Sequence, residues 1–207
     1  MRANQPYAIL LEVVLPRVTA WQNVLLVVVG SFFVALCAQI SLPLAFSPVP
    51  VTGQTFAVLL VGASFGARRA AAVLLLYLAE GAAGLPVFAP GGAPGLARFA
   101  GPTAGYLLLF PLAAFALGKL LALPGRQSFL RWLTALLAAE VIIFAGGVTW
   151  LKLMTSWPWQ QALLLGLVPF LPGELVKVML LGICLPASWW ALARRRSSGS
   201  AGMPEPH

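Results

Sequence analysis

Two ionisable side chains near the end of the chain, Glu174 and Lys177, have the spacing most typical of a binding site. Because they are three residues apart, they share one face of a helix. An ionisable side chain inside an apolar helix is costly and is a functional candidate by default. Pro172 and Gly173 directly precede the pair, and they would leave backbone N–H groups free to meet an anion or a carbonyl. The alternative is that the two charges only neutralise each other as a structural pair.

Arg98 is a second candidate, in a segment rich in Gly and Pro that spans residues 84–101. Its guanidinium could bind a carboxylate through two parallel hydrogen bonds. An arginine that only extends to the membrane interface is an equally good interpretation. Neutral and apolar side chains expected beside Arg98 are Gln54, Thr52, Tyr106 and Phe88.

The inventory of reactive residues excludes several classes of enzyme. The chain has no aspartate, and its single histidine is His207. Cys37 and Cys184 lie in apolar runs, where cysteine behaves as a small buried hydrophobe. Metal clusters, a Ser-His-Asp triad and a GxxxxGK[ST] phosphate loop are therefore absent from the sequence. We predict a protein that is not an enzyme, with no metal and no cofactor, and any energy for transport would come from a gradient or another subunit.

Two further glutamates have no clear role from sequence alone. Glu80 falls near the end of an apolar stretch and could reach the same cavity as Arg98. Glu140 lies in the middle of a long apolar stretch without a partner nearby in sequence. We expect it to face the interior of the protein in a protonated state.

The composition predicts that these residues are positioned by membrane helices. Of 207 residues, 60% are hydrophobic and 9% are charged, whereas a soluble domain has roughly a quarter of its residues charged. The mean hydropathy is +0.93. Apolar stretches of about 20 residues, long enough to cross a bilayer core of ~30 Å, recur along the chain. The net charge of +8 comes from short clusters between these stretches, which is typical of membrane flanks and not of a nucleic-acid interface.

We predict an all-α membrane protein, a bundle of six transmembrane helices with an extracytoplasmic Gly/Pro-rich loop between helices 3 and 4. The helices are expected near residues 21–45, 53–67, 69–84, 102–123, 129–155 and 170–193. The second and third are short for a crossing. The irregular loop must be buried in protein or line an aqueous cavity. Residues 1–193 form one domain in this prediction, and residues 194–207 form a disordered basic and polar cytoplasmic tail.

The basic residues predict the orientation, because cytoplasmic loops of membrane proteins are enriched in Lys and Arg. With six spans, one side carries most of them, and both termini are then cytoplasmic. These residues are Arg2, Arg17, Arg68, Arg69, Lys119, Arg126, Arg131, Arg194, Arg195 and Arg196. The candidate binding residues fall toward the opposite side, where three mostly apolar segments with a few polar groups have the character of a small-molecule pocket.

Small residues mark a possible docking face for a partner subunit. Ser31 and Ala35, and likewise Gly62 and Gly66, follow the small-xxx-small spacing that permits close approach of two helices. Such spacing is common in membrane helices, so packing within the chain is the favoured interpretation unless other support appears.

Several motifs together resemble the BioY family, the biotin-specific S components of energy-coupling factor transporters. They are AQISLPL (38–44), SPVPVTGQTFAVLL (47–60), GAAGLPVF (81–88), GPTAGYLL (101–108) and PFLPGELVK (169–177). The resemblance covers residues 31–184 and keeps the motifs in order. It implies a multi-pass protein of the bacterial inner membrane that binds biotin near the outer surface. It also implies docking on a transmembrane coupling subunit that two ATPases drive.

The resemblance assigns the family's acidic residue and lysine to Glu174 and Lys177, and its loop arginine to Arg98. Three departures stand out: Glu174 occupies a position that is often Asp, Ser31 replaces the first Ala of the usual docking motif, and Glu140 replaces an expected neutral residue.

Biotin suits this inventory. Its ureido N–H groups could donate to Glu174, its apolar ring could pack against the aromatic residues, and its carboxylate could pair with Lys177 or Arg98. Gln54 could serve either end. One alternative is an S component for thiamin or riboflavin, although cationic thiamin would meet an excess of cations here. The other is a membrane-embedded enzyme or a structural membrane subunit. The lack of catalytic residues opposes an enzyme, and the long Gly/Pro loop opposes a structural subunit.

Overall fold

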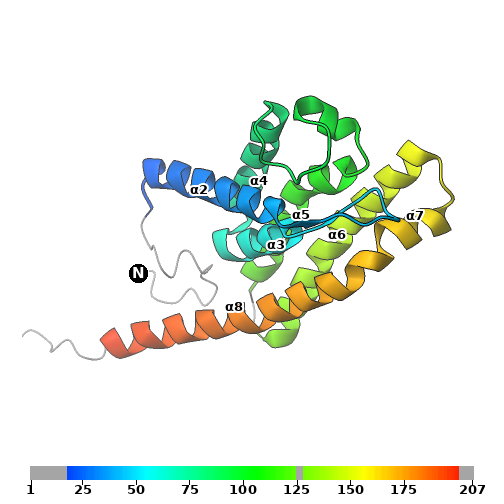
Figure 1. Cartoon of the computed structure of the whole chain (residues 1–207). Coiled ribbons are helices and arrows are strands. Elements are labelled where there is room, and N and C mark those ends of the chain that lie inside the picture. The colour runs from blue at the N-terminus through cyan, green and yellow to red at the C-terminus, as the bar shows by residue number, and fades with distance from the viewer. Residues whose placement is uncertain (1–17, 125–127, 201–207) are drawn as a thin grey trace, which may run out of the picture.

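A computed structural model describes residues 18–124 and 128–200, and these residues form α-helices joined by short irregular segments (Figure 1). The seven α-helices in this part of the chain are α2 (Ala20–Gln39), α3 (Gln54–Phe65), α4 (Ala67–Ala82), α5 (Ala104–Ala122), α6 (Phe129–Thr155), α7 (Trp159–Gly166) and α8 (Leu171–Ser200). The remaining elements are two 3-10 helices and a two-stranded hairpin: η1 (Gly95–Ala100), η2 (Val168–Phe170), β1 (Ser41–Leu42) and β2 (Val51–Thr52).

The first described helix, α2, ends at Gln39 and not at residue 45 as predicted. Pro43 disfavours a helical conformation at the residue before it, which turns the chain to an extended path. Strands β1 and β2 then pair antiparallel, and the Gly53 N–H donates to the Ile40 carbonyl over 2.9 Å. The sequence prediction missed this hairpin, which returns the chain to the end of α2 before α3 begins.

A sharp turn at Gly66 separates α3 from α4. Gly66 has φ +79°, a conformation that glycine adopts without the steric cost that a Cβ would bring. Helix α5 passes close to this turn, because a Cβ on Gly118 would meet the backbone of Ala67. The glycine at position 66 therefore makes the turn that stacks α3 and α4 against the centre of the bundle.

The last two helices differ from the prediction in two ways. Helix α7, which starts after Pro158, lies in a stretch predicted as a loop. Its short length hid it from a search for spans of about 20 residues. Helix α8 continues to Ser200, past residue 193, because arginine is a good helix former. The predicted tail therefore begins inside this helix, and its last residues, 201–207, lie outside the described part of the chain.

Among the described residues, four segments are long and apolar enough to cross a membrane: Ala20–Gln39, Ala104–Ala122, Phe129–Thr155 and Trp159–Ala187. Helix α3 has 12 residues, which gives roughly 18 Å of length, and α4 has 16. Both are shorter than a bilayer core, as the sequence predicted for the second and third helices.

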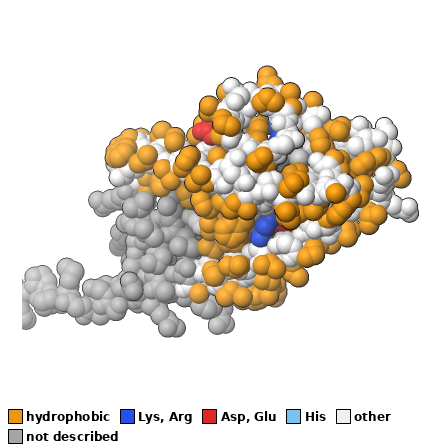
Figure 2. Space-filling model, viewed as in Figure 1, with side chains coloured by type: hydrophobic (Ala, Val, Ile, Leu, Met, Phe, Trp, Pro, Cys, Tyr) orange, Lys and Arg blue, Asp and Glu red, His pale blue; other side chains and the backbone are white. Residues whose placement is uncertain are grey.

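Helix α5 occupies the centre of the bundle and packs against α3, α4 and α6, while α2 covers α3 and α4, and α8 lies along α6 and α3. The core at these contacts includes the fully buried Leu59, Leu74, Leu117 and Ile143. Large apolar side chains also cover much of the visible outer surface (Figure 2). A water-soluble protein rarely exposes so much contiguous apolar surface, so this surface is suited to lipid.

Candidate ligand-binding site

The predicted binding residues gather around one small pocket, here called the inner pocket. Its free volume is about 40 Å³, which is room for a few water molecules. The hairpin, the segment after α4, and helices α3, α5, α6 and α8 supply its lining: Val49, Pro50, Thr52, Gln54, Thr55, Ala89, Arg98, Thr103, Tyr106, Leu107, Phe110, Phe144, Phe170 and Glu174. Among the predicted ligand residues, Glu174, Arg98, Gln54, Thr52 and Tyr106 line it directly, whereas Lys177 and Phe88 stand behind it.

Glu174 lies in the first turn of α8 and is 6% exposed. Lys177 Nζ is 2.7 Å from its Oε1 atom, so the predicted i, i+3 pair is an ion pair in the structure. The Thr55 hydroxyl from α3 lies 2.9 Å from Oε1 and 2.8 Å from Oε2 of the same carboxylate. Two helices that are far apart in sequence thus fix one carboxylate at the wall of the inner pocket.

All three N–H donors of Lys177 have an acceptor within the protein. Besides Glu174, Lys177 Nζ donates to the Thr52 carbonyl and to the Thr55 hydroxyl, each over 2.8 Å. An ammonium group has three donors and no acceptor, so the lysine is fully hydrogen-bonded. Lys177 therefore ties α8 to the start of α3 and sets the position of Glu174.

Gln54 lines the inner pocket from the first turn of α3 and is 6% exposed. The Thr52 hydroxyl donates to its Oε1 atom over 3.1 Å, and its Nε2 atom donates to the hydroxyl of Tyr77 in α4. The Tyr77 hydroxyl in turn donates to the Val87 carbonyl over 3.2 Å. This chain of hydrogen bonds holds the amide in one orientation at the wall of the pocket.

Arg98 comes from η1 and is also buried, at 5% exposure. Its Nη2 atom donates to the Ala89 carbonyl, and its guanidinium carbon lies 5.8 Å from the centre of the Phe88 ring. The Nε atom is buried without a hydrogen-bond partner among residues 18–124 and 128–200. Burial lowers the pKa of this guanidinium, and the nearby Tyr77 partly offsets that effect. A buried guanidinium with an unused donor has the chemistry to bind an anion.

A second space, here called the outer pocket, lies on the other side of Arg98 and has a free volume of about 190 Å³. Pro50, Arg98 and Thr103 line both pockets. Gly91 and Gly92 also line the outer pocket, and a Cβ on Gly92 would collide with the Arg98 guanidinium. The glycines of the Gly/Pro-rich loop thus leave room for the Arg98 guanidinium, and Arg98 lines both pockets.

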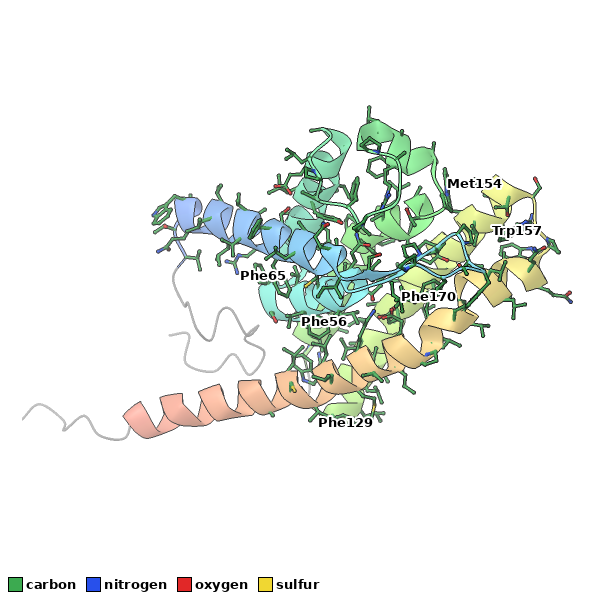
Figure 3. All side chains as sticks on the ribbon, in the orientation of Figure 1. Phe56, Phe65, Phe129, Met154, Trp157 and Phe170 are labelled. Carbon is green, nitrogen blue, oxygen red and sulfur yellow. The ribbon has the colours of Figure 1, made fainter. Side chains whose placement is uncertain are left out.

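Aromatic side chains form the apolar wall of the inner pocket. Tyr106 packs edge-to-face on Phe144, with ring centres 5.8 Å apart, and Phe144 in turn contacts Phe170. Figure 3 labels Phe170, which lies where η2 leads into α8. The Tyr106 hydroxyl donates to the Gly166 carbonyl of α7 over 2.7 Å. Phe88 contacts Tyr77 and Phe99 edge-to-face and supports Arg98 without lining the inner pocket.

Sequence reasoning missed the aromatic wall residues Phe110, Phe144 and Phe170, and it missed two residues that fix polar groups of the site, Thr55 and Tyr77. Thr55 directly follows Gln54 in the quoted motif, and this adjacency was the available signal. Nothing in the sequence marked Tyr77, because a single tyrosine in an apolar helix is usually a core residue.

The four small residues predicted as a docking face are buried inside the chain. The Ser31 hydroxyl donates to Glu80 of α4, and Ala35 belongs to the core. A Cβ on Gly62 would lie 3.1 Å from Ala114 of α5, and Gly66 forms the turn described above. Their spacing serves helix packing within the chain, and they offer no surface to another subunit in this structure.

Neither of the two remaining glutamates lines the inner pocket. Glu80 contacts Ser31 on the α2 side of α4 and does not reach the cavity near Arg98. Glu140 faces the interior, as predicted, and is 6% exposed.

Comparison with known proteins agrees with the motifs. The sequence model of the BioY family matches residues 11–194. The chain is 35% identical to the biotin transporter BioY of Rhizobium etli over 75% of this chain and 86% of that protein. It is 39% identical to the probable biotin transporter BioY of Pyrococcus horikoshii over 71% of this chain and 85% of that protein.

The fold is also similar to a solved structure, described as the S-component for biotin from an ECF-type ABC transporter. The TM-score is 0.70 at 24% identity, over 87% of this chain and 95% of that one. This likeness supports a common fold. Since the family model spans nearly all of the described residues and relatives above 30% identity are matched over most of their length, the chain belongs to the BioY family.

Proposed function

We propose that this chain captures biotin at the inner pocket and serves as the substrate-binding subunit of an energy-coupling factor importer. The observation that carries the proposal is the buried Glu174 carboxylate, held by Thr55 and Lys177 at the wall of a pocket that Arg98 closes. The family membership and the names of the relatives support the choice of biotin as the ligand.

The proposed pose follows from complementary chemistry. A ureido N–H donates to Glu174, and the ureido carbonyl accepts from the Gln54 amide in a rearranged hydrogen-bond chain. The apolar ring of biotin packs against Phe110, Phe144 and Phe170, which line the inner pocket. The carboxylate at the end of the tail extends to Arg98, whose Nε atom has no acceptor in the described protein. An apolar cleft with a few fixed polar groups is the usual form of such sites.

The size of the pocket implies that binding changes its shape. The inner pocket has about 40 Å³ of free space and the outer pocket about 190 Å³, and Arg98 lies between them. We propose that the Arg98 side chain shifts toward the glycines of the outer pocket when the ligand enters, which joins the two spaces.

The orientation and the partners belong to the same proposal. Six helices cross the membrane, with α3 and α4 as short crossings, both termini face the cytoplasm, and the Gly/Pro-rich loop faces outward. The distribution of Lys and Arg supports this arrangement. A transmembrane coupling subunit and ATPases provide the driving force, since the sequence has no phosphate-binding loop of its own.

The decisive experiment is competition for labelled biotin bound to detergent-purified protein. Unlabelled biotin should displace the label, whereas thiamin and riboflavin should not. Biotin amide, which lacks the anionic end, should compete about tenfold less well, because a hydrogen bond to a charged group is lost. Failure to retain any label would remove biotin as the ligand. Biotin amide competing as well as biotin would remove Arg98 as the carboxylate site.

A further inference from the structure

Glu140 of α6 is buried beside the proposed ligand site, and the proposed function gives it no task. Both of its carboxyl oxygens are buried without a hydrogen-bond partner among the described residues. The side chain lines an apolar groove of about 570 Å³ between α6, α7 and α8, here called the lateral groove. Taking an ionised carboxylate out of water without donors is among the costliest arrangements in a protein. The neutral form of Glu140 is therefore the one that suits this place.

Glu174 lines the same lateral groove from α8, and it also lines the inner pocket. Any effect of Glu140 on a ligand in the inner pocket would therefore pass through Glu174. The two glutamates thus face one space from neighbouring helices, since α6 and α8 pack against each other. Two ionised carboxylates cannot share such a site. A carboxylate oxygen only accepts, so a hydrogen bond between the two side chains requires a proton on one of them.

The surroundings decide which carboxyl carries that proton. The Glu174 carboxylate accepts from the Lys177 ammonium over 2.7 Å and from the Thr55 hydroxyl over 2.8 Å. Glu140 has no such donor in the described part of the chain. One cation, one carboxylate and one carboxylic acid also sum to zero charge, which is the least costly state inside a membrane.

Among the described residues, the lining of the lateral groove has no charged side chain besides Glu140 and Glu174. On α5 the titratable group packed on α6 is Tyr106, whose ring contacts Phe144 and whose hydroxyl is bonded to the Gly166 carbonyl. Helix α7 has no ionisable side chain, and α3 contributes the neutral Thr55. Lys177 of α8 is paired with Glu174.

We propose that Glu140 is a positioning residue that stays protonated and donates a hydrogen bond to the Glu174 carboxylate, which holds that carboxylate in place for the ligand. The effect of Glu140 on ligand binding rests on the proposed function, whereas the proton on Glu140 does not. Lys177 and Thr55 hold the carboxylate from the α3 side, and Glu140 holds it from α6. Loss of the proton would place a second negative charge beside Glu174 and push it away from its position.

The test compares Glu140→Gln, whose amide still donates, with Glu140→Met, which has similar size and no donor. We expect Glu140→Gln to bind labelled biotin like the unmodified protein at neutral pH. Glu140→Met should bind about tenfold more weakly, because one hydrogen bond to the charged Glu174 is lost. Thermal unfolding in detergent serves as the control, since methionine suits an apolar groove and the Met variant should remain folded.

The pH profile separates positioning from simple packing. As pH rises, the unmodified protein should lose biotin binding when Glu140 gives up its proton, whereas Glu140→Gln should stay level over the same range. A pH effect that does not involve Glu140 would appear in both proteins. Parallel pH profiles for the two proteins would contradict the proposal.

Infrared spectroscopy tests the proton without biotin. In protein labelled with ¹³C-glutamate, the carbonyl stretch of a protonated carboxyl should be present in the ligand-free form and absent in Glu140→Gln. Its absence from the unmodified protein would overturn the inference even if biotin binds. If this band is present in a protein that does not bind biotin, the proton on Glu140 is supported and the proposed function is rejected.

Discussion

Glu174 and Lys177 form an ion pair, but only Glu174 lines the inner pocket. Lys177 is saturated by Glu174, Thr55 and the Thr52 carbonyl, so its charge is neutralised inside the protein. Glu174 lines the inner pocket and retains acceptor capacity there. The structure therefore shows Lys177 as a structural partner, and Glu174 is the member of the pair that we propose as a ligand contact.

At this scale we predict the outcome of removing each member of the pair. Glu174→Ala should weaken biotin binding about tenfold or more, since a buried donor left without an acceptor costs about 1–3 kcal/mol. Lys177→Ala should also weaken binding, because an unpaired carboxylate remains. The double variant should bind no better than Glu174→Ala while remaining folded. Equilibrium binding and thermal unfolding of the purified variants provide the measurement.

The matched control is Glu80→Ala, which removes a hydrogen-bonded glutamate away from the inner pocket. It should lower stability and leave biotin binding intact. If the double variant binds like the unmodified protein, the pair only neutralises itself, and Arg98 and Gln54 become the remaining ligand candidates.

Helix α2 leaves much of its apolar surface uncovered. Only 22% of the most apolar stretch of this helix is buried inside the protein. Trp21, Val24, Val28 and Phe32 follow one another at intervals of three or four residues and are 65%, 66%, 46% and 63% exposed. This spacing places them on one face of the helix. Ser31, in contrast, is completely buried against α4. We propose that a coupling subunit meets the exposed face and not the small residues.

Enlarging a side chain on that face should therefore block coupling without affecting capture. Val28→Trp is expected to leave biotin binding unchanged and to abolish ATP-driven uptake, because the larger ring prevents close approach of the partner. Leu112→Trp is the matched control, on an exposed position of α5. Uptake by cells that express the coupling subunit and ATPases measures the first effect, and binding to purified protein the second. Normal uptake by the Val28 variant would exclude this face as the docking surface.

At the scale of the whole molecule, the position of the site depends on the orientation in the membrane. The Gly/Pro-rich loop that carries Arg98 faces outward if the arginine-rich side is cytoplasmic. The inner pocket then opens toward the exterior, from which a vitamin must be captured.

Labelling of single cysteines in sealed cells tests this orientation. In a protein with Cys37 and Cys184 replaced by serine, Ala93→Cys in the outer pocket should react with a membrane-impermeant maleimide. Gly125→Cys, in the predicted cytoplasmic connection outside the described residues, should react only after the cells are broken. The reverse pattern would place the site on the cytoplasmic side and contradict its role in capture from outside.

The sequence by itself determined most of the helices, although not α7, and where the ionisable residues fall on them. Long apolar stretches identify membrane helices because backbone groups must bond internally in lipid. The helical repeat makes Glu174 and Lys177 neighbours, however the helices of the bundle pack. The motifs around Gln54 and Glu174 were enough to indicate the family. The Gly- and Pro-rich composition of residues 84–101 marked the loop that holds Arg98, although not the contacts of its guanidinium.

Only the tertiary structure decided which helices meet. Thr55 and Glu174 are separated by 119 residues and Ser31 and Glu80 by 49, and no local pattern encodes these contacts. The same applies to the burial of Glu140 beside Glu174, on which the inferred proton depends. In lipid, apolar burial does not select between helix faces as it does in water, so close packing and individual polar contacts set the arrangement. These depend on the three-dimensional fit of every helix at once.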